Sequence, residues 1–87
     1  MERWELVFKA LSNINRLKIL KILKKEEKMH VTDISNKLGI SFMATSRHLL
    51  LLRNHEVLQY EGKNNHVFYS LNPDIPADFK KAINLVL

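Results

Sequence analysis

The sequence contains no cysteine, and only two glycines and two prolines are found among its 87 residues. Without cysteine there is no disulfide, no thiolate metal ligand and no thiol that senses redox state. The scarcity of glycine and proline, with a hydrophobic content of 46%, excludes a disordered tail. No apolar run approaches the roughly 18 residues that a membrane span needs. The composition therefore predicts one folded domain, residues 1–87.

Positive charge is the first functional indication. Lys and Arg outnumber Asp and Glu by 14 to 9, which gives a formal net charge of +5. A small basic domain attracts polyanions, but basicity also serves solubility, so charge alone leaves nucleic-acid binding open. The acids Glu2 and Glu5 stand where a secretory signal peptide carries only positive charge. We therefore expect a protein that stays in the cytoplasm.

Hydrophobic spacing predicts five helices. Apolar residues recur at i, i+3, i+4 and i+7, which places them on one face of a helix. The predicted helices span residues 2–11, 14–25, 31–38, 42–54 and 75–87. Ser12 or Asn13 can cap the second helix and Ser41 the fourth, while Gly39 suits the positive φ that ends the third. Helix, glycine turn and helix over residues 31–54 form a helix-turn-helix pattern.

The hydrophobic period then changes from about 3.6 residues to 2. Residues 57–61 and 66–71 are rich in Val, Tyr, Phe and Leu, and they flank a turn of hairpin type from Gly62 to Asn65. The predicted fold is therefore mainly α with a small β-hairpin, in the order α-α-α-α-β-β-α. A hairpin over residues 57–71 that follows a recognition helix is the wing of a winged helix-turn-helix protein.

The residues themselves resemble a known family. The run from Phe8 to Leu20, which contains Arg16, resembles the opening of the ArsR-like winged-helix repressors. The run from Leu38 to Arg53 contains Ser46-Arg47-His48-Leu49 and resembles their turn and recognition helix. The resemblance covers residues 4–73. It implies a homodimer that binds double-stranded DNA as a transcription regulator at the nucleoid, usually as a repressor released by an effector.

The metal sites of that family are not matched. The thiolates that many members use correspond here to His30 and Thr32, and the last helix has no His and one acid, Asp78. No two of the four histidines stand four residues apart, as chelation on one helix face needs. A structural role fits each histidine. His30 can cap a helix and His48 can pack within one, while His55 suits a cation at a helix C-terminus and His66 a wing tip. We expect no metal and no cofactor, and the sequence does not identify an effector.

One departure from the family concerns the end of the recognition helix. Members of the family usually have glycine where this chain has Glu56. The chain must turn there without glycine, so we expect Asn54 or His55 to take the positive φ.

Helical projection separates two sides of the helix over residues 42–54. Leu49 and Leu52 face the core together with Thr45 and His48, while Arg47 faces outward. The N-terminal part of a recognition helix contacts bases, and its flanks contact phosphates. The candidates for DNA contact on the helix and wing are Ser41, Phe42, Met43, Thr45, Ser46, Arg47, His48, Lys63, Asn64, Asn65 and His66.

Some of these assignments stay open in the sequence. Arg47 can pair with guanine or with phosphate. Phe42 and Met43 can pack on a thymine methyl or against the preceding helix. The wing tip is either a phosphate contact, which we favour, or an ordinary solvated turn. Leu50 is exposed in the projection and either contacts another element or is incidental.

The terminal helices carry the predicted dimer interface. Their apolar stripes consist of Trp4, Val7, Phe8, Leu11, Phe79, Ala82, Ile83 and Val86. These helices could instead cover the core of a single domain, but the resemblance favours pairing because family members pair through their first and last helices. A two-fold dimer places two recognition helices about one duplex turn apart, on a pseudo-palindromic site.

Two other function classes remain to be weighed. An assembly module without specific DNA readout would use Phe42, Met43 and Leu50 as an apolar patch for a protein partner. An enzyme has no support, because the sequence shows no phosphate-binding glycine loop and no nucleophile with a base and an orienting group. We therefore expect no catalytic residues.

Overall fold

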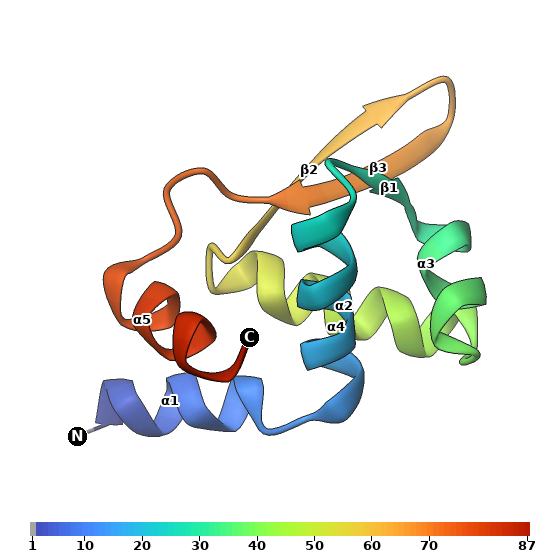
Figure 1. Cartoon of the computed structure of the whole chain (residues 1–87). Coiled ribbons are helices and arrows are strands. Elements are labelled where there is room, and N and C mark those ends of the chain that lie inside the picture. Colours follow the sequence, from blue (N-terminus) through green and yellow to red (C-terminus); the bar gives the residue numbers. More distant parts are fainter. Residues whose placement is uncertain (1) are drawn as a thin grey trace.

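The computed structural model of the chain, described over residues 2–87, has the predicted order of elements with one added strand (Figure 1). The elements are α1 (Glu2–Leu11), α2 (Ile14–Lys25), β1 (Met29–His30), α3 (Val31–Leu38), α4 (Phe42–Asn54), β2 (Leu58–Lys63), β3 (His66–Leu71) and α5 (Ala77–Val86). The predicted fold class is confirmed. Within residues 2–87, no helix is long and apolar enough to cross a bilayer.

The added strand, β1, has only two residues. Met29 pairs with Tyr69 and His30 with Phe68, both antiparallel, so that the sheet order is β1-β3-β2. A two-residue strand has no hydrophobic period that a sequence pattern could detect. Its pairing joins the start of α3 to the base of the hairpin, which holds the hairpin against the helical body.

Local capping explains where the central helices begin and end. The side chain of Asn13 accepts from the backbone N–H groups of Asn15 and Arg16 at the start of α2. Gly39 ends α3 with φ at 70°, and Ser41 accepts from the N–H of Ala44 to cap α4. The predicted caps at Ser41 and Gly39 are confirmed, and of the two candidates before α2 the chain uses Asn13.

The last helix is shorter than predicted. It begins at Ala77, with Pro76 at its N-cap and no side-chain capping bond. The N–H of Asp74 donates to Asn72 Oδ1 in the turn before the helix.

The end of α4 corrects the expectation about positive φ. Glu56 itself takes φ at 62°, while His55 stays at −91°. The reason is a Schellman ending, in which the N–H of Val57 donates to Leu52 O at 3.0 Å and that of Glu56 to Arg53 O at 2.9 Å. Both Leu52 and Val57 are buried, so the turn has to come at residue 56 to return the chain to the core.

The hairpin closes with a two-residue turn. Asn64 and Asn65 both have positive φ, at 53° and 64°, between the paired residues Lys63 and His66. Positive φ at both central positions is typical of a type I′ turn, whose twist matches that of the strands and which asparagine tolerates well. The first strand of the hairpin, β2, begins one residue later and ends two residues later than the predicted range of 57–61.

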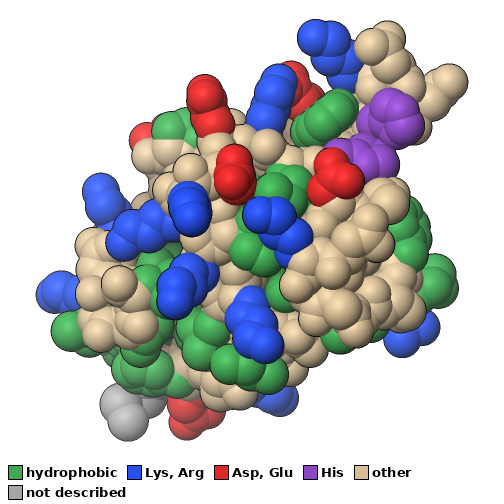
Figure 2. Space-filling model, turned by 45° about the vertical axis from the view of Figure 1, so that its right-hand side comes forward, with side chains coloured by type: hydrophobic (Ala, Val, Ile, Leu, Met, Phe, Trp, Pro, Cys, Tyr) green, Lys and Arg blue, Asp and Glu red, His purple; other side chains and the backbone are tan. Residues whose placement is uncertain are grey.

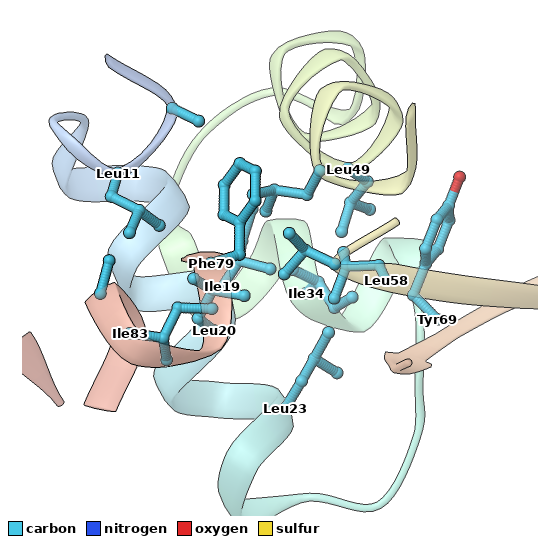
Figure 3. Packing of buried hydrophobic residues seen from close by; sticks show 14 of the residues in the cluster. Leu11, Ile19, Leu20, Leu23, Ile34, Leu49, Leu58, Tyr69, Phe79 and Ile83 are labelled. Atoms are coloured by element: carbon cyan, nitrogen blue, oxygen red, sulfur yellow. The ribbon is translucent and has the colours of Figure 1, made fainter. Parts of the chain in front are cut away.

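All five helices and the base of the sheet contribute to one hydrophobic core. Figure 3 shows the ring of Phe79 in the middle of this cluster. The largest fully buried apolar side chains are Phe79, Ile19, Leu20, Ile34, Leu49, Leu52, Val7 and Val57. Two of them, Val7 and Phe79, come from the terminal helices, so these helices are part of the domain itself.

This packing corrects part of the predicted dimer interface. Five of the predicted interface residues are buried within the chain itself: Val7, Leu11, Phe79, Ala82 and Ile83. They cannot also form an exposed surface, so for them the alternative reading, coverage of the core, is the right one. Trp4, Phe8 and Val86 stay exposed.

Replacing Glu56 with glycine should stabilise the protein. An L-residue at left-handed φ costs about 1–2 kcal/mol, and the extra chain entropy of glycine offsets about 0.5–1 kcal/mol of the gain. We expect Glu56→Gly to raise the free energy of unfolding by about 0.5–1 kcal/mol in a denaturant titration. Glu56→Ala keeps the Cβ and is the control, and an equal change in both variants would contradict the assignment of strain.

Candidate nucleic-acid interface

The N-terminal half of α4 is open to solvent. α3, the turn at Gly39 and α4 form a helix-turn-helix, and the cap at Ser41 sets the direction in which α4 leaves the turn. Phe42 is 53% exposed and Met43 62% exposed, and Arg47 is exposed one turn further on. Phe42 and Met43 therefore do not bury themselves against the preceding helix, and their side chains are available to a partner.

Thr45 does not belong to this open surface. Thr45 is 0% exposed, and its hydroxyl donates to the backbone oxygen of Ser41 at 2.9 Å. The prediction that Thr45 contacts DNA is wrong, because its side chain points into the core on the opposite side from Arg47. Ser46 lies between the two sides and is half-buried.

His48 lies on the half-buried side of α4, where its ring meets Arg16. Its Nδ1 is 3.2 Å from a terminal nitrogen of Arg16. Burial lowers the pKa of His48, and the positive charge of Arg16 lowers this pKa further. A neutral ring can accept from the guanidinium, so His48 is a packed residue that positions α4, and its predicted contact with DNA is not supported by this placement.

Arg16 itself joins three parts of the chain. Its Nε donates to Ala10 O at 2.6 Å, and a terminal nitrogen donates to Lys9 O at 3.3 Å. These oxygens belong to the last turn of α1, where backbone carbonyls lack helical partners. Through the same side chain, the end of α1 is linked to His48 on α4.

His55 differs from its expected role as a cation at the helix end. Its ring stacks on Phe79 with centroids 5.6 Å apart. Burial lowers the pKa of His55, and the charges of Arg3 and Arg16 lower this pKa further. The neutral ring is therefore the favoured form.

The hairpin projects beside the exposed part of α4 (Figure 1). Lys63, Asn64, Asn65 and His66 at its tip are all exposed. A hollow of about 210 Å³ separates hairpin and helix, and it is lined by His30, Val31, Phe42, Ser46, Asn65, Val67 and Tyr69. Phe42 and Ser46 of the helix thus line the same hollow as Asn65 of the wing.

A cation–π contact fixes the hairpin to the recognition helix. The guanidinium carbon of Arg53, in the last turn of α4, lies 3.7 Å from the ring centroid of Tyr60 on β2. Neither residue was predicted to have this role, since the contact depends on how the hairpin folds back on the helix.

The histidines of the sheet form a pair that the sequence did not predict. His30 Nε2 and His66 Nδ1 are 2.9 Å apart, and the rings meet edge to face. His30 is the N-cap residue of α3, as expected, but its side chain makes no capping hydrogen bond. The pairing of β1 with β3 brings the two rings together from 36 residues apart. Over residues 2–87, no cluster of three or more His, Cys, Asp or Glu side chains is arranged to hold a metal.

A helix-turn-helix followed by a hairpin that projects beside the second helix defines a winged helix-turn-helix domain. The chain belongs to the ArsR family of bacterial regulatory proteins. The family model described as "Bacterial regulatory protein, arsR family" matches residues 13–60, which run from the cap of α2 into the wing. The family resemblance seen in the sequence is confirmed.

Known proteins similar to this chain include two named transcription regulators. A cadmium resistance transcriptional regulatory protein CadC homolog of Staphylococcus aureus is 38% identical over 68 residues, which are 78% of this chain and 56% of that protein. The transcriptional repressor SdpR of Bacillus subtilis is 39% identical over 72 residues, 83% of this chain and 79% of the repressor. The chain thus spans little more than half of the first relative.

Among solved structures, NolR from Sinorhizobium fredii is similar over the whole fold. It aligns with a TM-score of 0.79 at 30% identity, covering 98% of this chain and 84% of NolR. The terminal helices are therefore part of the shared architecture as well as the central helix-turn-helix.

Protonation of His48 and His55 should weaken the fold. Both have lowered pKa values in the folded protein, so below the ordinary pKa of about 6.5 the unfolded chain binds more protons. Their contribution to stability is complete above that pKa and is lost as the pH falls through the lowered values. We expect the free energy of unfolding to decrease from about pH 7.5 to about pH 5.

The double variant His48→Gln and His55→Gln checks this expectation, because glutamine does not titrate and can still accept from Arg16. Its unfolding free energy should vary less with pH over the same range than that of the unchanged protein. Parallel pH profiles for the two proteins would contradict the assignment to these histidines.

Proposed function

We propose that the chain acts as a sequence-specific transcription regulator, a repressor, that binds double-stranded DNA as one winged helix-turn-helix domain per protomer. The observation that carries this proposal is the exposed N-terminal half of α4 with the hairpin projecting beside it (Figure 1). Support also comes from the name of the related SdpR, a transcriptional repressor. The regulatory family argues against an enzyme. The proposal includes a location at the nucleoid in the cytoplasm, because that is where a bacterial regulator meets DNA.

Each part of the surface has a distinct role in this proposal. The first turns of α4 enter the major groove, where Arg47 pairs with guanine O6 and N7 or with an adjacent phosphate. Ser41 and Ser46 donate to phosphate or base oxygens, and Phe42 and Met43 pack against thymine methyl groups. The wing tip follows the neighbouring backbone through Lys63, Asn64, Asn65 and His66.

A homodimer is the second part of the proposal. α1 and α5 lie together at the end of the molecule away from the wing tip, and Arg3 on α1 forms an ion pair with Asp78 on α5 (Figure 1). The exposed rings of Trp4 and Phe8 stack with centroids 5.7 Å apart. Apolar side chains left exposed on the two terminal helices and the last residue are Trp4, Phe8, Leu85, Val86 and Leu87.

In the proposed interface, this exposed set replaces the five predicted residues that are buried. Leu85, at 79% exposed, was missed because it lies outside the stripe that includes Phe79 and Ile83. An apolar surface of this kind on a small domain is typical of a protein interface. Pairing by a two-fold axis through these helices presents two copies of α4 to a pseudo-palindromic operator.

Two substitutions test the DNA surface. Arg47→Ala should weaken binding to the selected operator by about 1–3 kcal/mol and relax base preference at one position. Lys63→Ala should weaken binding to all sequences alike and reduce the slope of log affinity against log salt by about one. The operator is first selected from a random DNA pool, and affinities are then measured by fluorescence anisotropy across a salt series.

Lys81→Ala on α5 is the matched control, because Lys81 is exposed but lies on a terminal helix. Unchanged affinity of the Arg47 and Lys63 variants would contradict the assigned surface. If the unchanged protein bound all sequences equally, with no operator selected, the assembly module without specific readout would be favoured instead.

Phe8→Asp should separate the dimer. A carboxylate within the exposed apolar set would be desolvated in the interface, which is costly without a partner charge. We expect light scattering to give the monomer mass for this variant and the dimer mass for the unchanged protein, with weaker operator binding by the monomer. Glu2→Lys, on the same helix, should remain dimeric, and a dimeric Phe8→Asp variant with an unchanged melting curve would contradict the interface.

A further inference from the structure

Much of the positive charge of this protein lies outside the proposed DNA surface. A groove of about 470 Å³ runs between α2 and the end of α3. Its lining has four lysines and two apolar side chains, with Glu26 at the end of α2: Lys18, Lys21, Lys25, Lys37, Ile22 and Leu38. None of these residues lies in the first turns of α4 or in the wing.

The charges of the groove are not neutralised within the chain. The salt bridges of residues 2–87 are Arg3–Asp78 and Lys28–Glu61, and neither includes a lysine of the groove. The lining thus contains four lysines and one carboxylate, that of Glu26. Lys25 and Lys37 stand in the last turns of their helices and are favoured there by the helix dipole. Lys18 and Lys21 stand earlier in α2, so the dipole does not explain them.

The lining is not uniformly polar. Ile22 and Leu38 are only partly buried, and Leu38 packs on the hydrophobic core at its inner side. Figure 2 shows several Lys and Arg side chains gathered on one face of the molecule, with hydrophobic side chains between them. The volume of the groove falls within the range of about 300–1,000 Å³ in which proteins hold small molecules.

We propose that this groove binds an organic anion that has an apolar body, such as an aromatic or aliphatic carboxylate, sulfonate or phosphate ester. The lysine ammonium groups pair with the anionic group, while Ile22 and Leu38 cover the apolar part. An inorganic anion would use the lysines alone. A DNA backbone would lie across the lysines without filling the space between them.

Titration with 1-anilinonaphthalene-8-sulfonate, an aromatic sulfonate that fluoresces in apolar surroundings, tests this proposal. The test variant Lys21→Gln/Lys37→Gln removes one charge from each wall of the groove. The control Lys80→Gln/Lys81→Gln removes the same charge from α5. Because each exposed ion pair contributes modestly, we expect the groove variant to lose about fivefold or more in affinity and the control less than about twofold. Equal affinity of the two variants would overturn the proposal.

Competition separates the organic anion from a simple one. Methanesulfonate, which has the same anionic group without the ring, should displace the probe far less well than 2-naphthalenesulfonate at equal ionic strength. Equal displacement by the two would overturn the need for an apolar body.

A DNA titration separates the groove from the proposed function. The groove variant should keep the salt dependence of operator binding, since its lysines do not contact phosphates. A slope reduced by about two would assign the groove to the DNA surface and overturn the proposal. If the unchanged protein selected no operator but still bound the probe through the groove, the proposed function would fail while the groove site stood.

Discussion

The guanidinium of Arg16 holds together the elements on which the candidate site depends. It donates to carbonyl oxygens of Lys9 and Ala10 at the end of α1, and it lies against the ring of His48 on α4. Unpaired carbonyls at a helix end need donors, and a fork of N–H groups can supply several of them at once. The terminal helix and the recognition helix are thereby placed relative to each other by one side chain.

The terminal helices close the core and, in the proposed dimer, also present an interface. Val7 and Phe79 complete the core of the chain, whereas Phe8 and Leu85 remain on the surface of the same helices. An 87-residue chain has little apolar area to spare, so helices that present the proposed interface must also close the core. Changes at a buried position would therefore affect folding before they affected pairing.

The surface divides into regions of different chemistry. The exposed part of α4 and the wing combine Arg47 and Lys63 with apolar and hydroxyl side chains, as a surface that reads a duplex requires. The lysines of α2 surround a separate groove. A net charge of +5 says only that polyanions are attracted, and the two regions show that this charge is not concentrated on the recognition helix.

The order of the five helices and the hairpin, the turn at Gly39, the cap at Ser41 and the outward direction of Arg47 could be predicted from local sequence, because periodicity, capping and φ preference act over a few residues. Contacts between distant segments could not be predicted in this way. The pair of His30 and His66 required β1 to find β3, since the two stand 36 residues apart. An apolar stripe likewise cannot say which of its members a neighbouring helix will cover, because burial depends on what packs against it.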